Sequence, residues 1–117
     1  MILESAAEER PRDPRIHSAL GKTHALLGNN DESIRHGQRA VSFWPVSKDA
    51  VDGCSFELYL AEIYALIGEL ELATAKLEYL LSIPSPLSAA SLLFDPKWDP
   101  LRDHPRFQAL LEEYDTD

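Results

Sequence analysis

Cysteine is almost absent from this sequence of 117 residues, in which Cys54 is the single example. One cysteine cannot form a disulfide within the chain, and it cannot supply a zinc site built on several thiolates. A catalytic thiolate would need a neighbouring base, and the sequence gives no argument for a Cys–His arrangement. We therefore expect a buried or half-buried thiol in a reducing, cytoplasmic compartment.

Long hydrophobic runs are missing as well. No apolar stretch approaches the roughly 20 residues that a membrane-spanning helix needs. Residues 1–15 mix Glu and Arg without an apolar centre, so we do not expect them to act as a secretory signal.

Positive charge is scarce: 11 Lys and Arg face 20 Asp and Glu, which gives a formal net charge of -9. Nucleic-acid binding and docking on anionic lipid both need clustered Lys and Arg. The composition therefore argues against nucleic acid and membrane as partners. Hydrophobic residues make up 44% of the chain, enough to bury the core of one domain.

Motifs for catalysis are not found. The five glycines are scattered and do not form a phosphate-binding loop. The nucleophile elbow Gly-x-Ser-x-Gly and the zinc-binding helix His-Glu-x-x-His are both missing. We predict neither enzyme activity nor a cofactor.

What the sequence does contain is a pattern of paired helices, the first over 14–46. Asp13-Pro14 suits a helix start, because Asp accepts bonds from free N–H groups and Pro needs none at the first position. Gly28 predicts a turn with left-handed backbone, and Pro45 ends the second helix. The apolar face of the first helix is predicted at Ile16, Leu20, His24 and Leu27, and that of the second at Ile34, Gly37, Ala40, Val41 and Trp44.

A second pair is predicted over 47–84, with a longer first helix. Ser47 or Asp49 is the candidate N-cap, and Gly53 is a weak point or a bend. Gly68 predicts the turn and Pro84 the end. The first helix carries the strongest amphipathic pattern in the chain. Its apolar positions are Phe56, Leu60, Ile63, Tyr64 and Ile67, and those of its partner are Leu70, Ala73, Leu77, Leu80 and Leu81. Short turns predict antiparallel helices with their apolar faces together.

Similar residues occupy corresponding positions in the two predicted helix pairs. The first pair is marked by Leu20-Gly21, His24, Gly28, Ala40 and Pro45, and the second by Leu60-Ala61, Tyr64, Gly68 and Ala73. In these positions the chain resembles tetratricopeptide repeat proteins. The resemblance implies an all-α fold in which antiparallel helix pairs stack as a short α-solenoid. It assigns 14–46 to repeat 1, 47–84 to repeat 2 and 1–13 to the remnant of a preceding repeat.

The tail, 85–117, departs from the repeat. Ser85-Pro86 predicts a short helix to Leu93, and the three pairs Asp95-Pro96, Asp99-Pro100 and His104-Pro105 exclude one continuous helix afterwards. We expect Trp98 and Leu101 to pack on the second pair, and a last helix from Pro105 with Phe107, Leu110, Leu111 and Tyr114. The run from Trp98 to Arg102, followed by Pro105-Arg106-Phe107, resembles the capping segment that closes tetratricopeptide regions of bacterial signalling proteins. This implies the C-terminal part of a larger bacterial regulatory protein.

In such stacks the first helices of the pairs line a concave groove. The resemblance implies that the chain is a protein-interaction scaffold whose groove binds a peptide or domain of a partner. The expected groove positions are Arg15, Ser18, Lys22, Leu58, Glu62 and Ala65. Lys22 alone fits the Lys and Asn clamp that some family members use for a C-terminal carboxylate, so we expect mixed charged and apolar contacts instead. The alternative is self-association into a homo-oligomer through an open first face at 1–27.

The histidines and three aspartates of the tail are the remaining candidates for a metal site. His17 and His24 lie two helical turns apart, where packing is favoured over a metal pair, and no carboxylate is well placed with both. We expect His36 and His104 at the surface or in turns, His104 as a possible helix cap. Asp95, Asp99 and Asp103 are interpreted as capping residues rather than as a cation site.

Overall fold

The computed structural model describes residues 13–46, 48–83 and 87–114, apart from the side chains of 50–52 and 89. Helices account for its regular structure, and no strand occurs among these residues, which confirms the all-α prediction. The helices are α2 (Pro14–Leu26), α3 (Asn30–Phe43), α4 (Ala50–Leu66), α5 (Leu70–Ser82), α6 (Ala89–Phe94), the 3-10 helix η1 (Pro96–Leu101) and α7 (Pro105–Glu113). No helix in this part of the chain is long and apolar enough to cross a membrane.

Local signals set the ends of the first four helices. The Asp13 carboxylate accepts a bond from the Arg15 N–H at 2.9 Å, and Pro14 occupies the first turn of α2. Gly28 and Gly68 both have positive φ, 83° and 85°. After each of them the next N–H reaches back to a carbonyl in the last turn of the helix: Asn29 to His24 at 2.8 Å and Glu69 to Tyr64 at 2.9 Å. Two closely similar reversals therefore follow α2 and α4, as predicted.

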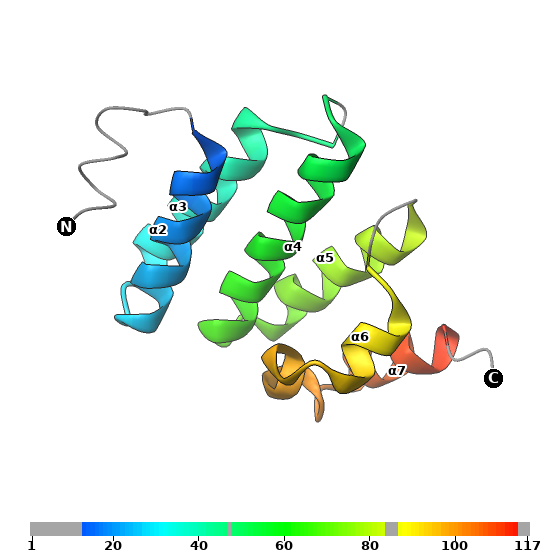
Figure 1. The fold of residues 1–117 in the computed structure, drawn as a ribbon. Coiled ribbons are helices and arrows are strands. Elements are labelled where there is room, and N and C mark those ends of the chain that lie inside the picture. Colours follow the sequence, from blue (N-terminus) through cyan, green and yellow to red (C-terminus); the bar gives the residue numbers. More distant parts are fainter. Residues whose placement is uncertain (1–12, 47, 84–86, 115–117) are drawn as a thin grey trace.

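The helices form two antiparallel pairs, α2 with α3 and α4 with α5, which lie side by side (Figure 1). Helix α4 is central, because it contacts α2, α3, α5 and η1. Its buried residues consequently face several directions, and Cys54, Glu57 and Glu62 are covered along with its apolar side chains. The prediction of a one-sided amphipathic helix is therefore wrong for α4, since neighbours cover it on most sides.

The segment after α5 folds back over α4 and α5 (Figure 1). Trp98 and Leu101 are buried, as predicted, and Phe107 is buried with them. Helix α6 begins at Ala89, with the Ser88 hydroxyl accepting from the Ser91 N–H at 3.3 Å; the predicted start at Ser85-Pro86 lies outside the described residues. Pro96 and Pro105 begin η1 and α7, whereas Pro100 lies inside η1, and the described part of this segment contains no long helix.

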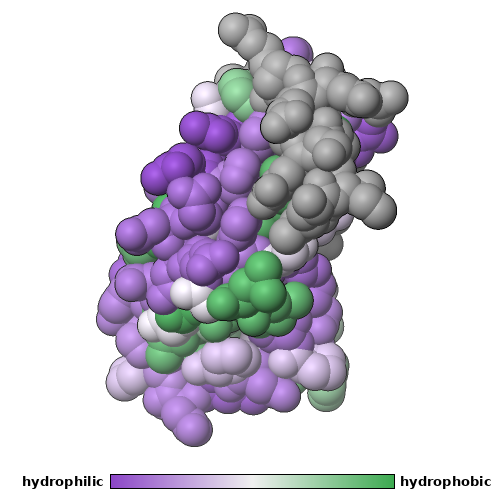
Figure 2. Space-filling model, turned by 90° about the vertical axis from the view of Figure 1, so that its left-hand side faces the viewer, coloured by the Kyte–Doolittle hydropathy of each residue, from purple (hydrophilic) through white to green (hydrophobic). Residues whose placement is uncertain are grey.

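Two local predictions need correction. Leu27 is 61% exposed, because α2 ends one residue earlier and the chain is already turning. Leu26 beside it is 75% exposed. Figure 2 views the side on which α2 and α3 lie, and shows a hydrophobic patch within a largely hydrophilic surface.

Gly53 is neither a weak point nor a bend. A Cβ at Gly53 would lie 2.6 Å from the backbone N and Cα of Val46, so glycine here permits close passage of the loop before α4. Asp49 directly precedes α4, and its carbonyl accepts from the Gly53 N–H at 2.8 Å. Ser47, the other candidate cap, and the 1–12 part of the expected repeat remnant lie outside the described residues.

Candidate functional site

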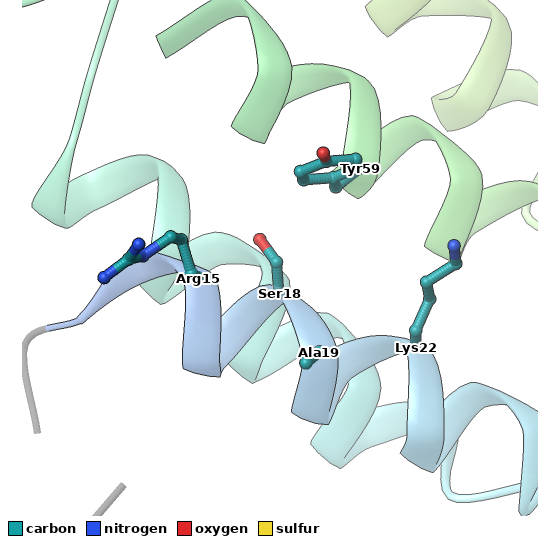
Figure 3. A pocket seen from close by; sticks show the side chains of 5 residues that line it. All are labelled: Arg15, Ser18, Ala19, Lys22 and Tyr59. Carbon is teal, nitrogen blue, oxygen red and sulfur yellow. The ribbon is translucent and has the colours of Figure 1, made fainter. Parts of the chain in front are cut away.

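A surface pocket lies between α2 and α4. It is lined by Arg15, Ser18, Ala19, Lys22 and Tyr59 (Figure 3), and its volume is about 300 Å³. The four residues from α2 have helical spacings of 3, 4 and 7, so they form one stripe along the helix. Tyr59 faces this stripe from α4 and is 39% exposed.

Two cations mark the ends of the stripe. The side chains of Arg15 and Lys22 are 79% and 51% exposed. Arg15 is bonded to Asp13, and this hydrogen bond is the largest cause that lowers the pKa of the Asp13 carboxyl. Both cations thus lie beside carboxylates while keeping much of their surface available to a ligand.

Ser18 is the unusual member of the pocket. The residue is 6% exposed, and its hydroxyl oxygen is buried without a hydrogen-bond partner among the residues that the structure describes. Figure 3 shows this oxygen pointing from α2 toward the Tyr59 side of the pocket. A buried hydroxyl without a partner is uncommon and costs roughly 1–3 kcal/mol, because its bonds to water are not replaced.

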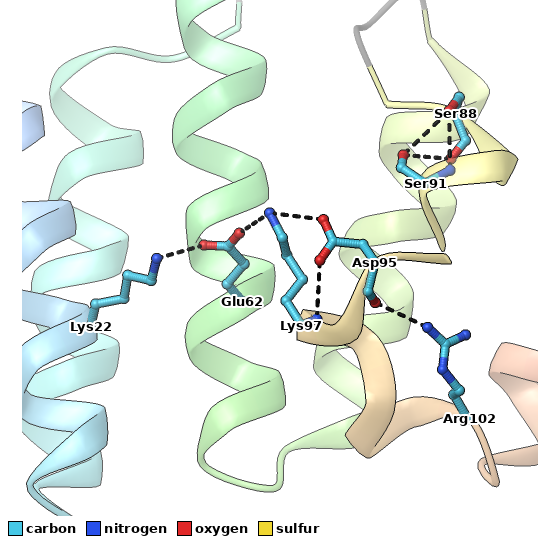
Figure 4. Close-up of polar contacts among 7 residues, drawn as sticks. All are labelled: Lys22, Glu62, Ser88, Ser91, Asp95, Lys97 and Arg102. Carbon is cyan, nitrogen blue, oxygen red and sulfur yellow. Dashed lines mark hydrogen bonds and ion pairs between the residues drawn. The ribbon is translucent and has the colours of Figure 1, made fainter. Parts of the chain in front are cut away.

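At one end of the pocket, Glu62 connects the helix pairs to the cap (Figure 4). Its side chain is 5% exposed, and its two oxygens lie 3.4 Å from Lys22 Nζ and 2.8 Å from Lys97 Nζ. Lys97 also lies 3.4 Å from Asp95. The hydrogen bond to Glu62 is the largest cause that raises the pKa of Lys97. This chain of charges links α2, α4 and η1 beside the pocket.

The expected groove residues divide into two groups. Arg15, Ser18 and Lys22 line the pocket together. Leu58 is half-buried against the hydrophobic core, while Ala65 and Glu62 are buried. Sequence reasoning did not identify Ala19 and Tyr59, which directly follow the predicted Ser18 and Leu58.

A second polar cluster lies between α2 and α3, where His36 stacks between two histidines of α2. Its ring centroid is 5.1 Å from that of His17 and 5.6 Å from that of His24, with interplanar angles of 20° and 3°. The Nδ1 atoms of His17 and His36 are 2.9 Å apart. His17 and His24 are buried, as favoured by the packing interpretation. The surface position expected for His36 is wrong, because its side chain is 12% exposed.

The same cluster contains a carboxylate. One oxygen of Glu32 lies 3.9 Å from His36 Nε2. Three residues, His24, Glu32 and His36, each offer one ligand atom, and these three atoms all lie within 4.8 Å of one another. Such an arrangement could hold a metal ion. This carboxylate lies near His24 and His36, not near the pair His17 and His24 that spacing along α2 suggested. The part played by His36 was not predicted.

Protonation of His36 should make the stability of the protein depend on pH. Burial is the largest cause that lowers the pKa of His36, followed by the charges of His17, Arg39 and His24; Glu32 opposes them. The unfolded chain therefore binds this proton more readily than the folded one. We expect the contribution of neutral His36 to the free energy of unfolding to be complete above about pH 6.5. It should decrease as the pH falls below that value.

Urea denaturation at several pH values between about 8 and 5.5 would measure this effect. His36→Gln should flatten the dependence, whereas His104→Gln should retain it. An unchanged slope in His36→Gln would contradict the assignment.

The remaining candidates have structural surroundings. The Asp95 carboxylate caps η1 by accepting from the Lys97 N–H at 3.1 Å, and Asp99 pairs with Arg102 at 2.8 Å. His104 precedes α7 but makes no side-chain cap; its Nε2 lies 3.0 Å from Glu71. Cys54 is 1% exposed, and burial raises the pKa of its thiol, which disfavours the nucleophilic thiolate.

Comparison with models of known protein families, with curated proteins and with solved structures finds no match to this chain.

Proposed function

We propose that this chain is a tetratricopeptide-like interaction module, and that the pocket between α2 and α4 binds an extended segment of a partner protein. Two antiparallel helix pairs with closely similar reversals at Gly28 and Gly68 support the repeat interpretation. The lateral contact of α2 with α4 supports it further, because first helices of successive pairs pack side by side in such stacks. In this proposal 14–46 and 47–84 are the two repeats and the tail caps the stack.

The unsatisfied hydroxyl of Ser18 is the observation that carries the proposal. A peptide offers a backbone carbonyl or N–H at every residue, and either group can bond to a serine hydroxyl. The side chain of Tyr59 adds an apolar wall with a polar tip, which is typical of protein interfaces. Arg15 and Lys22 favour an acidic side chain in the same segment. The ligand that fits this combination is an extended peptide with a hydrophobic and an acidic residue.

The proposed function is binding without catalysis, in the C-terminal part of a larger bacterial regulatory protein. Lys22 is already engaged by Glu62 at 3.4 Å, and Glu62 would repel a nearby carboxylate. A tight clamp on a C-terminal carboxylate is therefore disfavoured at this end of the pocket. The more exposed Arg15 is the better partner for an acidic side chain.

Peptide display against the full chain, followed by calorimetric titration of a selected peptide, tests the proposal. Tyr59→Ala should weaken binding about 10-fold or more, because central aromatic residues dominate interface energies. Tyr79→Ala is the matched control, since Tyr79 is 42% exposed but lies on α5. Failure to select any peptide, or equal losses in the two variants, would contradict the proposal.

Self-association is the second candidate function, and the exposed Leu26 and Leu27 favour it. They lie at the end of α2, within the segment 1–27 through which the alternative of self-association was expected. In this proposal a second copy of the chain covers them. Sedimentation at several concentrations should show a dimer that Leu26→Glu disrupts. A strict monomer at all concentrations would exclude it.

A further inference from the structure

We infer that His24, Glu32 and His36 form a binding site for a divalent transition-metal ion such as Zn²⁺, in the space between α2 and α3. The three residues supply two imidazole nitrogens and one carboxylate oxygen. This is a donor set that catalytic and regulatory zinc sites use, with a fourth position left for water or another ligand. The site is separate from the pocket between α2 and α4 and does not depend on its function.

The distances within the cluster suit a shared ion better than direct contact. The 3.9 Å between His36 Nε2 and Glu32 Oε2 is too long for a hydrogen bond. Two ligands bound tetrahedrally to one Zn²⁺ at 2.0–2.2 Å are about 3.4 Å apart. No pair among the three ligand atoms exceeds 4.8 Å. Binding therefore needs the ligand atoms to move closer together, and one imidazole ring to turn, without a change in the helices.

The positions of the ligands on the backbone are well defined. Glu32 and His36 are one turn apart on α3, so they project from the same face. His24 is on α2, and its ring is almost parallel to that of His36, at 3°. The turn at Gly28, whose φ is 83°, joins the two helices and fixes their separation at this end of the pair. The two helices and the turn fix the backbone of the ligands, but stacked, parallel rings direct their lone pairs into separate planes, so one ring must rotate for both histidines to share an ion.

Neighbouring side chains contact the Nδ1 atoms of both histidine ligands. His36 Nδ1 lies 2.9 Å from His17 Nδ1, and His24 Nδ1 lies 3.2 Å from the side-chain amide of Asn29. With Nδ1 of both rings bonded in this way, the metal would take Nε2. The Nδ1–H of His36 would then donate to His17. At His24 the Asn29 side chain presents its Nδ2 to Nδ1, so this amide must turn over before His24 Nδ1–H can donate to its oxygen. Hydrogen bonds of this kind fix the tautomer and direction of metal-bound histidines.

Charge and burial are also compatible with an ion. Arg35 binds the other oxygen of Glu32 at 2.6 Å and so leaves Oε2 directed at His36. The two histidines are largely covered, whereas the Glu32 side chain is 42% exposed. The site is therefore open to solvent on the Glu32 side, which provides both an entry path and room for the fourth ligand. Protons compete with the metal ion for the histidine nitrogens and the carboxylate, so binding should weaken in acid.

Titration of the full chain with ZnCl₂, using protein free of a histidine tag and monitored by calorimetry, tests the inference. We expect one Zn²⁺ per chain with a dissociation constant in the micromolar range. His24→Gln and His36→Gln should each weaken binding about 100-fold, and Glu32→Gln or His17→Gln about 10-fold. His104→Gln is the matched control and should bind as the unchanged protein does, because His104 contacts Glu71 at a distant site.

A second measurement keeps the test valid if a variant folds poorly. Co²⁺ added to the unchanged protein should produce the visible absorption of a four-coordinate site, and Zn²⁺ should abolish it. Absence of Zn²⁺ binding below millimolar concentration, or equal loss of binding in His104→Gln and His36→Gln, would overturn the inference. Binding that survives in both His24→Gln and His36→Gln would overturn it as well.

Discussion

Replacing Trp98 with alanine is expected to lower the free energy of unfolding by about 3–5 kcal/mol. Trp98 is 1% exposed and is the largest fully buried side chain of the described residues. It belongs to a core that includes Leu60, Leu77 and Phe107, from α4, α5 and α7. Its removal leaves a cavity where the cap meets both helices of the second pair, and the backbone of η1, with two prolines, is poorly suited to collapse into that space.

Urea denaturation monitored by circular dichroism would measure this loss, with the slope of the transition as a check on two-state behaviour. Phe94→Ala is the matched control: Phe94 is an aromatic residue of the same cap but is 81% exposed, so its loss should cost less than about 0.5 kcal/mol. Similar losses in the two variants would show that the cap does not stabilise the helix pairs through Trp98. A detached cap would also separate Lys97 from Glu62 and so disturb one end of the pocket.

The start and end of most helices could be predicted because the signals are local. Asp13-Pro14, Gly28, Gly68 and Pro105 each act through the backbone of two or three adjacent residues, and each lies where the sequence places a helix boundary. Leu27 is the informative exception. It continues the apolar spacing of α2, but the turn begins before it, so periodicity alone assigned it to a buried face.

Burial of α4 on most sides could not be predicted in the same way. Its sequence gives a helix, but which faces are covered depends on α2, α3, α5 and η1 arriving from distant segments. Glu57 and Glu62 are buried because lysines from α5 and η1 reach them, at 2.7 and 2.8 Å. From the sequence alone, such carboxylates resemble residues of an exposed face.

The candidate sites show the same division. The stripe of Arg15, Ser18 and Lys22 follows from helical spacing within α2, so the sequence predicted it. The opposing residue depends on the rotation of α4: one residue corresponds to about 100° on a helix, which separates Tyr59 from Leu58. The histidine cluster depends on the alignment of α2 with α3, which brings His36 between His17 and His24. Spacing within one helix cannot reveal a partner 19 residues away.

Gly53→Ala is expected to lower the free energy of unfolding by about 2 kcal/mol, although alanine is the better helix former by about 1 kcal/mol. The added Cβ would lie 2.6 Å from two backbone atoms of Val46 and 2.8 Å from the carbonyl carbon of Pro45. Backbone cannot swing aside as a side chain can, so the loop between α3 and α4 must move. That loop joins the two helix pairs.

Position 68 provides a comparison with position 53, because glycine is needed there for a different reason. A Cβ there meets nothing within 4 Å, and the strain comes from the positive φ of 85°. Asparagine tolerates left-handed backbone, so Gly68→Asn should cost less than Gly68→Ala. At Gly53 asparagine should cost at least as much as alanine, since any Cβ meets the same backbone. Urea denaturation of the four variants measures these differences, and rescue by asparagine at Gly53 would show that close approach to Val46 is not what requires glycine there.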